Sequence, residues 1–169
     1  MKKCILYYSK SGNTEYAAKY LAGKIDAAII KLVEKKNRNG IFGFIKSGFQ
    51  AINKKSSKLG GNPWEDIKDY DEIYFMTPIW ASNGTPAFNA FMEEMDLNGK
   101  RIHVVTLQAD SGKKGSKEVH KYFKIKIEKA GGHVIDSYAL TSGPPNKFAG
   151  NEVIEKEVDD IILKKLVLV

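Results

Sequence analysis

The sequence KCILYYSKSGNT, residues 3–14, joins an apolar run to a polar loop that contains a glycine. After Lys3, residues 4–8 form a continuous apolar run, which is typical of a strand buried on both faces of a sheet. The polar loop that follows surrounds Gly12, and Asn13 or Thr14 can cap the helix predicted over residues 14–22. The stretch therefore predicts a buried strand that passes through a polar loop directly into a helix.

The rest of the chain repeats this alternation. Strands are predicted over residues 3–9, 27–33, 72–77, 102–108 and 133–140. Helices are predicted over residues 14–22, where Gly23 is expected to end the first, and over 86–95, 115–130 and 152–168. Strands separated by helices give a parallel sheet covered on both faces. The sequence thus predicts one α/β domain over residues 1–169, a three-layer, doubly wound sandwich with a five-stranded parallel sheet.

The crossover between the second and third predicted strands, residues 34–71, is unusually long and basic. Its apolar segments 41–45 and 49–52 suit one short amphipathic helix. Residues 31–58 hold eight basic residues and one acid, which accounts for the net charge of +7. Such a segment fits an acidic protein partner, nucleic acid, a membrane surface or a merely solvated face. Because no nucleic-acid motif accompanies it, we expect no nucleic-acid partner.

The composition excludes several classes of protein. The chain has 169 residues, of which 43% are hydrophobic and 28% charged, so it can bury a core. One cysteine and three scattered histidines offer no disulfide and no metal-ligand spacing. The longest apolar runs are far below the ~20 residues of a membrane helix, and no signal peptide is evident. We expect a cytoplasmic protein that binds neither metal nor membrane.

Ligands of an open parallel sheet bind at the carboxyl ends of its strands, near the switch point of the strand order. The first loop there is residues 9–14. Backbone N–H groups at the helix start and the hydroxyls of Ser9, Ser11 and Thr14 form a nest for an anion, and Gly12 allows close approach. The spacing matches neither a P-loop nor a dinucleotide fingerprint, which favours a single terminal phosphate. The alternative is an ordinary polar strand–helix turn.

Two further loops lie at the same predicted edge. In residues 77–86, Trp80 follows a strand within a turn punctuated by Pro and Gly, where it is better placed to lie on an aromatic ligand than in the core. Trp64, in contrast, is expected to pack. Residues 108–112 offer backbone donors and no aromatic side chain.

Together the three loops resemble the flavodoxin family, over the whole chain. The resemblance implies the strand order 2-1-3-4-5, the cofactor FMN, a phosphate grip by the first loop and stacking of Trp80 on the flavin. The cofactor-binding residues implied are Ser9, Lys10, Ser11, Gly12, Asn13, Thr14, Thr77, Pro78, Ile79, Trp80, Ala81, Ser82, Asn83, Gly84, Gln108, Ala109, Asp110, Ser111 and Gly112. The Ser82-Asn83-Gly84 turn, in which Asn83 and Gly84 tolerate positive φ, is a candidate for a movable N–H donor to flavin N5.

Two features depart from the family pattern. Electron-carrying flavodoxins are usually acidic, whereas this chain is basic, and the third loop lacks the second aromatic that often covers the flavin. The resemblance implies an electron carrier between proteins, and the basic segment predicts partners that present acidic docking faces. Without the second aromatic, one flavin face is either open or covered by the crossover, residues 34–71. An open face suits the alternative, an NAD(P)H:quinone-type reductase. The oligomeric state stays open.

No side chain is predicted to be a catalytic acid or base. His103 and His133 lie in predicted strands and are expected to be structural, while His120 lies on a lysine-rich helix and is expected to be solvated. Cys4 lies in an apolar strand, where a thiol is usually inert. The chemistry is therefore expected to come from the cofactor.

Overall fold

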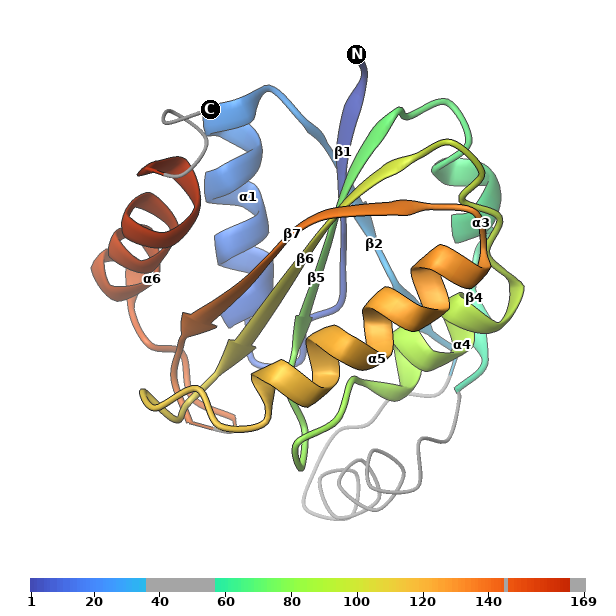
Figure 1. Ribbon diagram of the computed structural model, residues 1–169. Helices are drawn as coiled ribbons and strands as arrows, with labels where there is room; N and C mark the ends of the chain where they lie inside the picture. The colour runs from blue at the N-terminus through green and yellow to red at the C-terminus, as the bar shows by residue number, and fades with distance from the viewer. Residues whose placement is uncertain (36–56, 145, 165–169) are drawn as a thin grey trace.

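The computed structural model describes residues 1–35, 57–144 and 146–164. Five parallel strands form one sheet in the order β2-β1-β5-β6-β7 (Figure 1). Their bounds are β1 Lys3–Tyr7, β2 Ala28–Lys31, β5 Glu72–Pro78, β6 Arg101–Gln108 and β7 His133–Thr141. Numbered along the chain, these strands have the order 2-1-3-4-5, which confirms the predicted doubly wound α/β sandwich.

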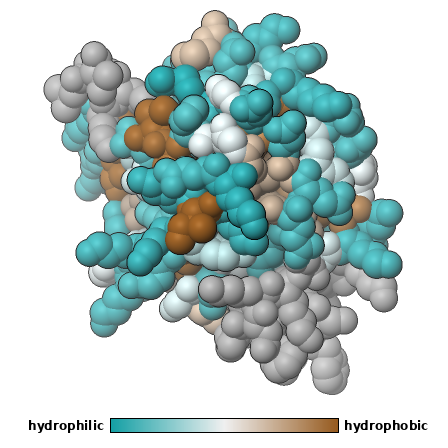
Figure 2. Space-filling model, turned by 45° about the vertical axis from the view of Figure 1, so that its right-hand side comes forward, coloured by the Kyte–Doolittle hydropathy of each residue, from teal (hydrophilic) through white to brown (hydrophobic). Residues whose placement is uncertain are grey.

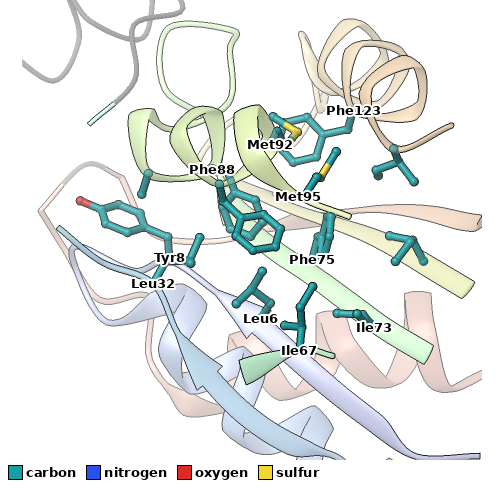
Figure 3. Close-up of a cluster of buried hydrophobic side chains, with 14 of the residues drawn as sticks. Leu6, Tyr8, Leu32, Ile67, Ile73, Phe75, Phe88, Met92, Met95 and Phe123 are labelled. Carbon is teal, nitrogen blue, oxygen red and sulfur yellow. The ribbon is translucent and has the colours of Figure 1, made fainter. Parts of the chain in front are cut away.

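Helices cover both faces of the sheet, as Figure 1 shows. The helices on one face are α1 (Asn13–Ile25) and α6 (Asn151–Val158), and those on the other are α4 (Pro86–Glu94) and α5 (Ser116–Lys129). Under α4 and α5, Leu6 and Phe75 of the sheet meet Phe88 and Phe123 in a fully buried aromatic cluster (Figure 3). The side chain of Thr85 accepts a hydrogen bond from the Phe88 N–H and so caps α4.

Two tyrosines fix α1 against α6. The Tyr16 hydroxyl donates to Glu155, and the Tyr20 hydroxyl donates to Asp159 at 3.0 Å. Helix α1 does not end at Gly23, as the sequence had suggested. It continues to Ile25 and is terminated at Asp26, whose φ of 53° lies in the left-handed region. The last helix is α-helical over Asn151–Val158 and continues as a π-helical turn, η1 (Asp159–Leu163).

Two short antiparallel strands, β3 (Val33–Glu34) and β4 (Leu59–Gly60), pair near the two ends of the long crossover. The Lys35 N–H donates to the Lys58 carbonyl at 2.8 Å, next to this pair. The short helix α3 (Pro63–Asp66) follows, and Trp64 there donates from Nε1 to the Phe91 carbonyl at 3.0 Å. Trp64 thus packs, as expected, whereas the helix expected within residues 41–52 lies outside the described residues.

Exposed large apolar side chains of the described residues include Ile29, Val33, Ile125 and Phe148. Figure 2 shows one side of the molecule, where the brown patches are small and lie among teal polar groups. Within residues 1–35, 57–144 and 146–164, no helix has the length and apolar character needed to cross a membrane.

Candidate functional site

A cleft of about 360 Å³ opens at the carboxyl ends of the strands. All three loops predicted from the sequence contribute to its lining. From the first loop come Lys10, Ser11, Asn13 and Thr14; from the second, Pro78, Ile79, Trp80, Ala81 and Ser82; from the third, Gln108, Ala109 and Asp110. The other predicted residues belong to the same three loops but are not among those that line the cleft: Ser9, Gly12, Thr77, Asn83, Gly84, Ser111 and Gly112.

The first loop presents a helix start to the cleft. Gly12 is the N-cap of α1, with a φ of 87° that favours glycine, and no side chain caps the helix. Thr14 is 2% exposed, although it lines the cleft. The Ser9 Oγ is buried and has no hydrogen-bond partner among the described residues. Backbone amides and hydroxyls therefore converge where an anionic group can bind.

Asn13 ties this loop to the chain beyond β7. Its Nδ2 donates to the Lys147 carbonyl at 2.7 Å and to the Ser11 Oγ at 3.0 Å, and its Oδ1 accepts from the Ala149 N–H at 2.8 Å. The side chain is 4% exposed. The side-chain amide of Asn13 thus bonds to other residues of the protein. Asn13 lines the cleft, but its side chain stabilises the shape of the cleft.

The second loop is a tight hairpin turn. Trp80 and Asn83 exchange two backbone hydrogen bonds of 2.9 Å, and the residues between them, Ala81 and Ser82, have φ values of 47° and 57°. Two positive φ angles define a type I′ turn. The positive φ angles therefore fall one to two residues before the Asn83-Gly84 pair that the sequence had suggested. Gly84 is needed for a different reason: a Cβ there would lie 2.8 Å from Phe123.

Trp80 forms an aromatic wall of the cleft. The Tyr8 ring meets it edge-on, with 5.6 Å between the ring centroids and 79° between the planes. The Tyr8 hydroxyl donates to Glu34 Oε2 at 2.7 Å, which anchors the tyrosine. The Lys10 Nζ lies 5.7 Å from the centroid of the Trp80 ring. Trp80 is thus packed on one side and only partly buried, so an aromatic ligand can lie against it.

Asp110 stabilises the third loop through hydrogen bonds from backbone N–H groups within and just after it. The Asp110 carboxylate accepts hydrogen bonds from the N–H groups of Lys114, at 2.9 Å, and Gly112, at 3.1 Å. These two bonds lower the pKa of Asp110. Gln108 donates to the Asp110 carbonyl at 3.4 Å, while its buried Oε1 has no partner within the described chain. At the cleft this loop offers an amide oxygen and backbone groups, and no aromatic ring.

A fourth wall was missed by the sequence reasoning. Ser142, Gly143, Pro144 and Asn146, which follow β7, also line the cleft. The Ser142 N–H donates to the Gln108 carbonyl at 2.8 Å, so this segment continues the third loop. The signal was available, because the rule that selects the carboxyl ends of strands applies to the last strand as well.

The histidines and the cysteine lie away from the cleft lining. His120 is not solvated, as the sequence had suggested: its Nε2 lies 2.8 Å from the Thr106 Oγ1, and burial lowers its pKa. His103 is 2% exposed and stacks on Tyr74 with 4.3 Å between centroids, which fits its expected structural role. His133 begins β7 and is exposed. Burial raises the pKa of Cys4 to about 12, so the thiol stays protonated.

The fold and the cleft place the chain among the doubly wound α/β proteins whose ligand site combines an anion nest with an aromatic wall. A family model described as flavodoxin matches residues 2–142. The chain belongs to the flavodoxin family, a family of FMN-binding flavoproteins. No curated protein matches it.

Solved structures of low sequence identity share the fold. A Bacteroides uniformis protein provisionally described as a flavoprotein is 19% identical, with a TM-score of 0.70 over 94% of this chain and 97% of that one. A Lactobacillus acidophilus flavoprotein in complex with FMN is 19% identical, with a TM-score of 0.62 over 82% and 92%. A flavodoxin, WrbA-like protein of Agrobacterium tumefaciens is 15% identical, with a TM-score of 0.60 over 92% and 89%.

Proposed function

We propose that this protein binds FMN in the cleft and carries electrons between protein partners. The observation that carries the proposal is that the start of α1, which no side chain caps and from which Asn13 and Thr14 line the cleft, shares this cleft with the aromatic wall at Trp80. A ligand that has a phosphate at one end and a flat aromatic system at the other matches both features. The structure of the Lactobacillus acidophilus relative in complex with FMN supports the same ligand.

The chain's own groups fit this cofactor. The Ser9 and Thr14 hydroxyls and the first amides of α1 would hold the phosphate, and Trp80 would lie against the ring. The buried oxygens of Ser9 and Gln108 have no partners among the described residues, and polar atoms left in that state are normally satisfied by a ligand or water. Bound FMN would supply electron transfer in one- or two-electron steps, while the protein binds, orients and shields it.

The test is direct. The purified protein should be yellow, and its apoprotein should regain a flavin spectrum on titration with one equivalent of FMN. Riboflavin should bind more weakly, because it lacks the phosphate that the loop around Gly12 would hold. A colourless protein that FMN does not alter in spectrum or thermal stability would refute the proposal.

A second candidate function is that of an NAD(P)H:quinone-type reductase. The favouring observation is the third loop, where Gln108 and Asp110 line the cleft and no aromatic ring faces Trp80 from residues 108–112. A small acceptor would have access to a flavin face left open in this way. Rapid NAD(P)H oxidation that depends on quinone favours the reductase. Slow oxidation, together with fast electron exchange with a protein, favours the carrier.

We also propose that the partner presents an acidic face. Residues 31–58 carry a net charge of +7. Glu34, the acid within this range, accepts a hydrogen bond from the hydroxyl of Tyr8, and the Tyr8 ring packs edge-on against Trp80. Oppositely charged surfaces speed encounter, and salt screens this effect over about 10 Å at 0.1 M and about 3 Å at 1 M. Reduction of an acidic redox protein should therefore slow steeply with salt, and replacing Lys54, Lys55 and Lys58 by Gln should flatten the slope. A slope that the triple variant keeps would place docking elsewhere.

A further inference from the structure

We propose that Lys10 sets the reduction potential of the bound flavin by holding a positive charge beside the ring. The inference rests on the proposed FMN site and assigns to Lys10 a role at the ring rather than at the phosphate.

The geometry directs Lys10 away from its own loop. Its backbone belongs to the phosphate loop, between Ser9 and Ser11, yet its Nζ lies 5.7 Å from the centroid of the Trp80 ring in the second loop. Lys10 lines the cleft, and its Nζ is buried. Because Lys10 and Trp80 both line the cleft, a ligand bound there against Trp80 would have this ammonium group nearby.

The other charges that line the cleft have different surroundings. The Asp110 carboxylate belongs to the third loop and accepts two backbone N–H bonds, which spread its charge onto that loop. Lys114 is exposed, so water screens it. Among the charged groups of the described lining, Lys10 thus combines a buried charge with proximity to the aromatic wall.

A buried cation next to a redox ring has a defined electrostatic effect. Reduction places negative charge on a flavin, and a nearby ammonium stabilises that charge more strongly in a poorly solvated cleft than in water. Lys10 should therefore raise the midpoint reduction potential of the bound flavin.

The experiment compares Lys10→Met, which keeps the length and removes the charge, with Lys10→Arg, which keeps the charge. Lys129→Met is the matched control, because it removes one exposed charge at the last turn of α5, away from the cleft. The readouts are the two-electron midpoint potential and the dissociation constant of sulfite. Sulfite forms a bond from its sulfur to N5 of oxidised flavin and leaves its electron pair and a negative charge on the ring, so it reports stabilisation of that charge.

We expect Lys10→Met to bind sulfite about tenfold more weakly and to have a midpoint potential about 30 mV lower, since a tenfold change in a two-electron equilibrium corresponds to about 30 mV. Lys10→Arg and Lys129→Met should stay near the wild type. The same shift should appear when riboflavin replaces FMN.

Two other results overturn the assignment and are distinguishable from each other. If Lys10→Met weakens FMN binding far more than riboflavin binding, with the potential unchanged, Lys10 pairs with the phosphate. If the potential, sulfite affinity and flavin affinity are all unchanged, Lys10 does not face the ligand. In either case the FMN site itself stands. If the wild-type protein binds no flavin, the proposed function and this inference fail together.

Discussion

Replacing Asn13 by Ala should detach the fourth wall of the cleft. The substitution removes two hydrogen bonds that join the first loop, residues 9–14, to the segment after β7. One runs from Asn13 to the Lys147 carbonyl at 2.7 Å, and the other from the Ala149 N–H to Asn13 at 2.8 Å. Each such bond contributes about 0.5–1.5 kcal/mol net, so the free energy of unfolding should fall by about 2 kcal/mol. With a urea m-value of about 2 kcal/mol/M, the unfolding midpoint should fall by about 1 M.

The assay is urea unfolding of the apoprotein, followed by far-ultraviolet circular dichroism. Asn13→Asp should lose about half as much stability, because its carboxylate can still accept from Ala149 but cannot donate to Lys147. Asn151→Ala is the matched control, since Asn151 is exposed at the start of α6. An Asn13→Ala midpoint that coincides with that of the control would show that the two bonds do not hold the loop, and the reasoning would fail.

The other predictions concern the ligand and pH. Thr14→Val should weaken FMN about tenfold to a hundredfold and riboflavin little, because one hydroxyl bond to a charged group is lost; equal losses would remove Thr14 from the phosphate site. Trp80→Ala should weaken both flavins and raise the potential, as water reaches the reduced ring; unchanged affinity and potential would assign Trp80 to the core. Burial lowers the pKa of His103 and His120 below 6.5. Near this pH the unfolded state therefore binds more protons at these two imidazoles than the folded state does. Stability should therefore fall as the pH drops below 6.5, by up to about 1.4 kcal/mol per pH unit for each histidine, and replacing both by Gln should flatten this dependence.

The sheet could be predicted because buried parallel strands leave a strong signal. The apolar run at residues 102–108 gave β6 to within one residue of Arg101–Gln108. The predicted end of α1 at Gly23 was wrong. Gly23 is exposed, and a solvent-facing glycine destabilises a helix by only about 1 kcal/mol. Packing of Leu21 and Ala22 against the sheet is enough to carry the helix past it.

His120 shows how residue type can mislead where spacing does not. It lies three residues before Phe123 and seven before Ile127, both buried on the inner side of α5. Helical spacing therefore placed it toward the sheet, but its polarity and the surrounding lysines suggested solvent. The Thr106 hydroxyl in β6 explains the observed position, because it gives the Nε2 atom of His120 a polar partner on the inner side of the helix.

The composition of the cleft depends on contacts that no local pattern records. The three predicted loops follow β1, β5 and β6, and each could be found from its own strand. The fourth wall joins them because Asn13 reaches across 134 positions to Lys147 and 136 to Ala149. The sequence marks Asn13 only as a helix-start residue, a role that needs no distant partner. The family match covers residues 2–142, so Lys147 and Ala149 lie outside the matched range. The fourth wall could therefore be recognised only from the folded chain, in which the two long bonds of Asn13 bring the first loop and the segment after β7 together.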